Sequence, residues 1–129
     1  MKIKATKLKL INDLFEVIET SVKEVSFIIA IKLNPNHIIY TGHFPGHPVT
    51  PGVVQLQIVH ELIEEQFSQQ VKLISISRCK FLKILNPNET SQVVVHIGFV
   101  RIGELLNIEA RGENGIDIFF KLNSVYQFV

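Results

Sequence analysis

The chain has 129 residues, of which 47% are hydrophobic and 19% charged, so it is long enough to build one globular domain, and its composition excludes intrinsic disorder. Its 13 basic and 12 acidic side chains leave a formal charge of +1, which excludes the broad positive surface of a nucleic-acid-binding protein. We therefore expect a single domain over residues 1–129.

Cysteine content and the first residues indicate the compartment. Cys79 is the only cysteine, so the chain cannot form an internal disulfide and has no cysteine pair for a metal. The start, MKIKATKLKL, has four lysines but no apolar core of signal-peptide length, and no run approaches the roughly 20 apolar residues of a membrane span. These features predict a cytoplasmic protein without a metal, a nucleic-acid partner or a membrane partner.

Two strands are predicted between Leu14 and Leu33, because Val, Ile and Phe alternate there with polar residues. A break near residues 21–24 separates them. Asn34-Pro35-Asn36 ends the second strand, since proline lacks a backbone donor and restricts the residue before it. A loop is expected from there to Pro51.

A helix is predicted from Pro51 to about Gln69. Apolar residues recur in this segment at helical spacing and form a broad face: Val53, Leu56, Val59, Ile63 and Phe67, with Val54, Ile58 and Leu62 beside them. Because so much of its surface is apolar, the helix must be largely covered by other structure.

Four segments of strand character follow the helix, at residues 71–82, 90–101, 105–111 and 116–128. Turn-forming sequences separate these four: Asn86-Pro87-Asn88, Gly103 and Gly112-Glu113-Asn114-Gly115. Consecutive strands without helices between them favour an antiparallel meander. Six strands and one helix thus predict an α+β domain whose sheet curls around the helix.

Residues 42–57, GHFPGHPVTPGVVQLQ, carry the candidate chemistry. The prolines and glycines around His43 predict a stiff loop that holds its imidazole in place, and imidazole is the commonest general base near neutral pH. Pro51-Gly52 opens the helix, where free N–H groups and a partial positive charge can polarise a carbonyl. The two features together predict proton abstraction next to a carbonyl, whereas a structural hydrogen bond is the alternative for a lone loop histidine.

The stretch GHFPGHPVTPGVVQL resembles the signature of the (3R)-hydroxyacyl-acyl-carrier-protein dehydratases of fatty-acid synthesis, in which an HFPG loop precedes PGV and the central helix of a hotdog fold. Lys80-Phe81, Pro87 and Glu89 resemble the family's later strand and proline turn, with Asn88 where a glycine is usual. The resemblance covers about residues 14–126 and implies a hotdog fold.

The resemblance also implies roles. His43 would remove a proton from C2 of a 3-hydroxyacyl thioester, the N–H of Gly52 would bind the thioester oxygen, and a trans-2-enoyl thioester would result. The expected substrate-lining residues are Phe44, Pro45, Gly46, Val49 and Val53. The acyl chain would be carried on the phosphopantetheine of acyl carrier protein or on CoA, with no cofactor of the protein's own. A homodimer with two composite sites, or a higher oligomer, is implied as well.

Gln57 departs from the family pattern. Fourteen positions after the histidine, the family carries an acid from the other subunit that assists loss of the 3-hydroxyl. An amide can donate a hydrogen bond or orient a water, but it cannot deliver a proton. Glu61, one turn further along the helix, is a candidate replacement acid, as is Glu64 with His60 nearby; the alternative for both glutamates is an exposed polar stripe.

Three functions stay open at this point. The first is a dehydratase-type lyase. The second is a thioesterase in which Gln57 orients a water or the substrate. The third is an acyl-thioester-binding subunit with weak or no activity of its own, serving as the partner of another subunit.

Overall fold

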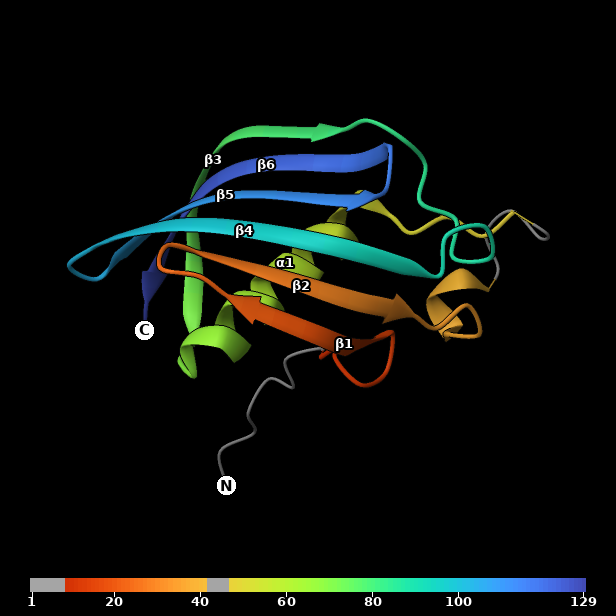
Figure 1. Ribbon diagram of the computed structural model, residues 1–129, viewed down its shortest axis with the longest axis horizontal. Coiled ribbons are helices and arrows are strands. Elements are labelled where there is room, and N and C mark those ends of the chain that lie inside the picture. The colour runs from red at the N-terminus through yellow and green to blue at the C-terminus, as the bar shows by residue number, and fades with distance from the viewer. Residues whose placement is uncertain (1–8, 42–46) are drawn as a thin grey trace, which may run out of the picture.

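The computed structural model describes residues 9–41 and 47–129, which form one six-stranded antiparallel sheet curled around a single long helix (Figure 1). The elements are β1 (Phe15–Val22), β2 (Ser26–Leu33), the short 3-10 helix η1 (Ile38–Tyr40), α1 (Gly52–Phe67), β3 (Val71–Phe81), β4 (Gln92–Ile102), β5 (Leu105–Asn114) and β6 (Asp117–Phe128). The strands lie in the order β1-β2-β4-β5-β6-β3. The predicted α+β hotdog architecture is confirmed.

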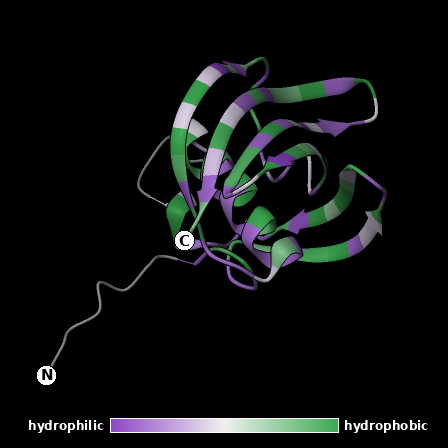
Figure 2. Ribbon diagram, turned by 90° about the vertical axis from the view of Figure 1, so that its left-hand side faces the viewer, coloured by the Kyte–Doolittle hydropathy of each residue, from purple (hydrophilic) through white to green (hydrophobic). Residues whose placement is uncertain are grey.

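The core lies between α1 and the concave face of the sheet. Hydrophobic and hydrophilic residues alternate along much of the strands, as the coloured bands in Figure 2 show. Because successive strand residues point to opposite faces of a sheet, this alternation puts apolar side chains toward the helix. On β2, for example, Phe27, Ile29, Ile31 and Leu33 are buried. The helix supplies the opposite wall with fully buried side chains: Val59, Leu62 and Ile63. Burial of this apolar surface on both layers fixes the helix within the curve of the sheet.

The buried face of α1 differs from the prediction at its first turn. Val53 was expected on the apolar face, but its side chain is 75% exposed. Two polar residues, Gln55 and Glu61, are buried instead, beside Val54 and Ile58. The difference arises because hydrogen-bond partners from other segments satisfy both polar side chains at least in part. Apolar spacing along the helix could not reveal those partners.

The β5–β6 connection also corrects the prediction. Gly112 was expected in a turn, but β5 continues through it to Asn114, and the loop consists of Gly115 and Ile116 alone. Gly112 is the β5 partner of Phe120 on β6, and the register of the two strands shifts directly after it. A Cβ on Gly112 would lie 2.2 Å from Cε2 of the Phe120 ring. Gly115 has φ +62°, which suits the first position of a two-residue hairpin turn. The two glycines therefore serve different purposes.

None of the helices in the described part of the chain has the length and apolarity needed to cross a membrane. The described part of the N-terminal segment, residues 9–14, packs onto the domain, since Leu10 and Leu14 are both fully buried. This packing brings the backbone of residues 10 and 11 next to α1.

Candidate active site at the start of α1

The predicted site residues divide into two groups. His43, Phe44, Pro45 and Gly46 lie outside the described residues, so their roles stay predictions. The others lie along the first turns of α1 and the segment that leads into it: Val49, Gly52, Val53, Gln57 and Glu61.

The start of α1 has the geometry of an anion-binding site. The carbonyl of the N-cap residue, Pro51, accepts hydrogen bonds from the N–H groups of Val54 (3.0 Å) and Gln55 (3.1 Å). The N–H groups of Gly52 and Val53 therefore precede the helical ladder and have no carbonyl partner within the helix. The first turn contains no acidic residue that would neutralise the positive end of the helix dipole. An oxygen that gains negative charge can be stabilised at this place.

Gly52 allows an aromatic ring to approach the helix start closely. A Cβ at this position would lie 2.6 Å from Cζ of Phe81, on β3. Beside it is a hollow of about 320 Å³ with mostly apolar walls, to which Val49, Pro51, Phe81, Leu82 and Ile84 contribute. Apolar walls beside free N–H donors lower the local dielectric, which strengthens the interaction between those donors and a developing charge.

A buried polar cluster supports the segment before the helix. The hydroxyls of Tyr40 and Thr50 are 2.8 Å apart, Thr50 N donates to Leu85 O (2.8 Å), and Gln55 Nε2 donates to Thr50 O (2.9 Å). Burial raises the pKa of the Tyr40 hydroxyl, and the hydrogen bond to Thr50 partly offsets this. This cluster was not predicted; its one signal in the sequence is Gln55, a glutamine within an otherwise apolar run.

Gln57 and Glu61 form a pair one helical turn apart. Gln57 Nε2 donates to Glu61 Oε2 at 2.9 Å. Glu61 also accepts from Leu10 N at both carboxylate oxygens (2.8 and 2.9 Å) and from Ile11 N (2.8 Å). The expectation of an exposed stripe is wrong for Glu61, which is 6% exposed. The N-terminal segment covers it, and its carboxylate joins that segment to the helix.

Glu64 and His60 anchor the other half of α1. Glu64 Oε2 accepts from Val71 N, the first residue of β3, at 2.9 Å and lies 3.4 Å from His60 Nε2. The His60 ring packs edge-on against Tyr126, with centroids 5.5 Å apart. Both side chains are mostly buried, so the exposed-stripe expectation is wrong for Glu64 as well. These residues join the helix to β3 and β6.

Comparison with known proteins identifies the family. Residues 19–103 match the family model of ApeI-like proteins, described as ApeI dehydratase, and this range includes His43 and the whole of α1. The chain belongs to the ApeI-like dehydratase family. The predicted resemblance to the hotdog dehydratases of acyl-carrier-protein substrates is thereby confirmed.

Individual relatives agree with this assignment. The 3-hydroxyacyl-[acyl-carrier-protein] dehydratase FabZ of Rickettsia massiliae is 26% identical over 111 residues, which are 68% of this chain and 77% of that protein. FabZ of Wolbachia pipientis wMel is 33% identical over 75 residues, 53% of this chain and 52% of its own. The dehydratase heterocomplex ApeI:P from Xenorhabdus doucetiae matches with a TM-score of 0.69 at 20% identity, covering 86% and 96% of the two chains, which shows the shared fold.

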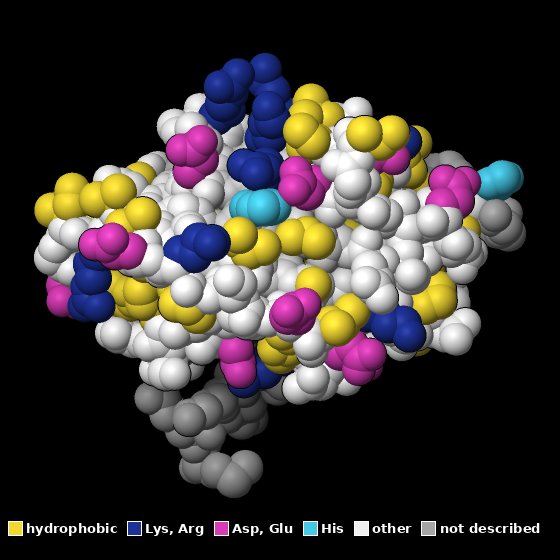
Figure 3. Space-filling view, viewed as in Figure 1, with side chains coloured by type: hydrophobic (Ala, Val, Ile, Leu, Met, Phe, Trp, Pro, Cys, Tyr) yellow, Lys and Arg dark blue, Asp and Glu magenta, His cyan; other side chains and the backbone are white. Residues whose placement is uncertain are grey.

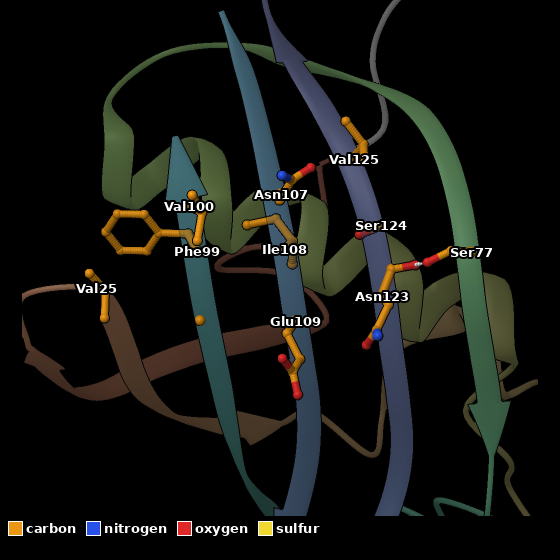
Figure 4. A pocket seen from close by; sticks show the side chains of 11 residues that line it. Val25, Ser77, Phe99, Val100, Asn107, Ile108, Glu109, Asn123, Ser124 and Val125 are labelled. Atoms are coloured by element: carbon orange, nitrogen blue, oxygen red, sulfur yellow. Dashed lines mark hydrogen bonds between the residues drawn. The ribbon is translucent and has the colours of Figure 1, made fainter. Parts of the chain in front are cut away.

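The larger hollows of this ApeI-like chain lie on the opposite face of the sheet from α1. Their volumes are about 440 and 640 Å³, and both are bordered by Gly98, Glu109 and Asn123. Figure 4 shows Glu109 and Asn123 on neighbouring strands of this face, with Ser77 Oγ donating to Asn123 O at 3.3 Å. The sheet separates these hollows from the N–H groups of Gly52 and Val53 at the start of α1. The smaller hollow at the helix start is therefore the better candidate site for proton abstraction next to a carbonyl.

A row of basic side chains lies on the same outer face, one at each paired position of four neighbouring strands. Lys80, Lys121, Arg111 and His96 are successive partners on β3, β6, β5 and β4, and Figure 3 shows Lys and Arg side chains gathered over this part of the sheet. Glu113 accepts from His96 Nε2 (2.7 Å) and Arg111 Nε (3.2 Å). Burial opposes ionisation of Glu113, but these two partners together lower its pKa. Among the described residues no group of three His, Cys, Asp or Glu side chains could hold a metal ion.

Proposed function

We propose that this chain eliminates water from (3R)-3-hydroxyacyl thioesters to give trans-2-enoyl thioesters, with the acyl chain carried on acyl carrier protein during fatty-acid or related acyl-chain synthesis. The observation that carries the proposal is the start of α1 in a chain of a dehydratase family. There the N–H of Gly52 has no hydrogen-bond partner among the described residues and lies beside an apolar hollow. FabZ relatives that act on acyl-carrier-protein substrates support the choice of carrier.

The proposed reaction uses two groups of this chain. His43 takes the proton from C2 of the substrate, and the electron pair of that C–H bond moves toward the thioester carbonyl. The N–H of Gly52 and the helix dipole stabilise the resulting negative charge on the thioester oxygen. The C2=C3 double bond then forms while the C3–O bond breaks. The departing hydroxide needs one proton to leave as water, and the imidazolium of His43 supplies it.

Gln57 makes this enzyme slower than a relative with an acid at the same place. An acid at this place is a second proton donor besides the imidazolium of His43, and general-acid assistance is worth up to about 10²- to 10⁴-fold in rate. Stabilisation of the enolate by Gly52 does not depend on that acid. The expected enzyme therefore turns over slowly while it retains its reaction type.

The edge strand β3 is the proposed dimer interface. Among the described strands only β6 pairs with it. Five apolar side chains on β3 or directly after it are between 40% and 51% exposed: Leu73, Ile74, Ile76, Phe81 and Leu82. A long, apolar, unpaired edge favours pairing with another strand. Phe81 and Leu82 also border the hollow at the helix start, so a second copy docked on β3 would close that hollow. The alternative partner is another dehydratase subunit, since ApeI forms the heterocomplex ApeI:P.

The test is incubation with a 3-hydroxyacyl thioester of acyl carrier protein, with the enoyl product and the free thiol measured in the same samples. We expect enoyl product without free thiol, and loss of that product in His43→Ala. His47→Ala is the matched control, because His47 is an exposed residue four positions further along the same segment. Free thiol without enoyl product would instead identify a thioesterase. Ligand affinity without either product would identify a binding subunit.

A further inference from the structure

Glu61 is a buried carboxylate whose recorded partners are all N–H donors. Oε1 accepts from Leu10 N and Ile11 N, and Oε2 accepts from Leu10 N and from Gln57 Nε2, at distances of 2.8 to 2.9 Å. The two backbone donors belong to a segment that is itself fixed by the buried side chains of Leu10 and Leu14. Glu61 is therefore held in place independently of Gln57.

This arrangement determines which end of the Gln57 amide meets the carboxylate. An ionised carboxylate can only accept hydrogen bonds, so the NH₂ end must face it. If the amide turned end over end, Gln57 Oε1 would face Glu61 Oε2 and two oxygen acceptors would repel each other. The amide oxygen of Gln57 is consequently directed away from Glu61, and it has no hydrogen-bond donor among the residues that the structure describes.

We infer that Glu61 is a positioning residue that orients Gln57 so that its amide oxygen accepts a hydrogen bond from the 3-hydroxyl of the substrate. The inference deepens the proposed function, on which it rests. Gln57 then selects chains that carry a 3-hydroxyl. It gives no proton to the departing oxygen, because the oxygen end of an amide has none to give.

The size of the expected selectivity follows from the value of one neutral hydrogen bond. Such a bond changes affinity by about 3- to 10-fold. A ligand with a 3-hydroxyl should therefore bind about 3- to 10-fold more tightly than the same acyl chain without it. A structural role of Glu61 alone would alter stability but would leave this ratio unchanged.

The test compares the affinities of 3-hydroxyacyl and acyl pantetheine amides, in which an amide replaces the thioester and prevents hydrolysis. The proteins are wild type, Gln57→Ala, Glu61→Gln and the double variant, each also characterised by thermal unfolding. We expect the hydroxyl preference in wild type only, with a ratio near one in all three variants. Glu61→Gln should lower the melting temperature in both the wild-type and the Gln57→Ala background, because the N–H groups of Leu10 and Ile11 lose their carboxylate partner in either one.

Several results would overturn the inference. One is an unchanged hydroxyl preference in Gln57→Ala, which remains informative even if Glu61→Gln does not fold. Another is a folded Glu61→Gln variant that prefers the 3-hydroxyacyl amide as strongly as wild type does. A third is failure of wild type to bind either amide or to distinguish between them. If wild type shows the preference but forms no enoyl product from the thioester, the proposed function fails and the inference about Glu61 stands.

Discussion

Two glycines of this chain lie against phenylalanine rings, and each contact has a measurable consequence. Gly52 keeps the start of α1 open beside Phe81, while Gly112 leaves room for Phe120 where the register of β5 shifts. Neither contact depends on the torsional freedom of glycine, since only Gly103 and Gly115 have positive φ among the described glycines. The absence of a Cβ is what matters at both positions.

Gly112→Ala should therefore destabilise the fold. The added methyl would meet Phe120 Cε2 at 2.2 Å, and overpacking of this kind typically costs about 1–3 kcal/mol. Gly98→Ala is the matched control, because a Cβ at Gly98 meets only Glu109 O at an ordinary 3.6 Å. Urea unfolding of both variants measures the difference. Equal stabilities would show that the Phe120 ring moves aside freely.

The charged cluster on the outer face predicts a pH dependence. His96 and Arg111 hold the pKa of Glu113 below its ordinary value of 4.5 despite the opposing effect of burial. The contribution of this carboxylate to stability is therefore complete above pH 4.5 and is lost as the pH falls through the lowered folded-state pKa. The difference in urea midpoint between wild type and Glu113→Gln should shrink as the pH falls below 4.5. A difference that stays constant down to about pH 3 would argue against this ion cluster.

At the scale of the elements, α1 illustrates what the sequence could and could not predict. Apolar spacing predicted its extent to within two residues at each end, and alternation predicted all six strands. The same spacing placed Val53 on the buried face and Glu61 on the exposed one, both wrongly. Burial of Glu61 depends on N–H donors fifty residues earlier in the chain, and no local pattern contains that information.

The end of α1 offers a simple stabilising change. Ser68, the C-cap residue, has φ 50° and ψ 40°, a left-handed conformation that a side chain disfavours and glycine accepts. Ser68→Gly should stabilise the protein by about 0.5–1 kcal/mol, as measured by thermal or urea unfolding. Ser68→Ala retains the Cβ and should give no gain. A destabilised Ser68→Gly variant would show that the serine hydroxyl has a role at the helix end that the backbone geometry does not reveal.

At the scale of the whole molecule, the proposed β3 interface predicts how substitutions change the oligomeric state. Ile76→Lys places a charge on the apolar edge and should shift a dimer toward monomers in sedimentation velocity. Ile116→Lys makes the same change at the tip of the β5–β6 hairpin, where the side chain is 98% exposed, and should leave the dimer intact. A monomeric wild type, or a dimer that survives Ile76→Lys, would point to another interface.

The sequence motif located the start of the helix, but it did not reveal the residues that support it. GHFPGHPVTPGVVQL marked the helix start, and the open N–H groups of Gly52 and Val53 are located there. The buried support by Tyr40, Thr50 and Gln55 was not predicted, because it joins segments through side-chain hydrogen bonds that have no periodic signature.

The central claim is that His43 removes the C2 proton of a 3-hydroxyacyl thioester bound at the start of α1. Incubation of that thioester with the protein in D₂O, followed by mass spectrometry of the recovered material, tests this step even where loss of water is slow. We predict deuterium at C2 together with slow formation of enoyl product, both lost in His43→Ala and both retained in His47→Ala. Absence of deuterium and of enoyl product with wild type, or equal exchange in His43→Ala, would contradict the account.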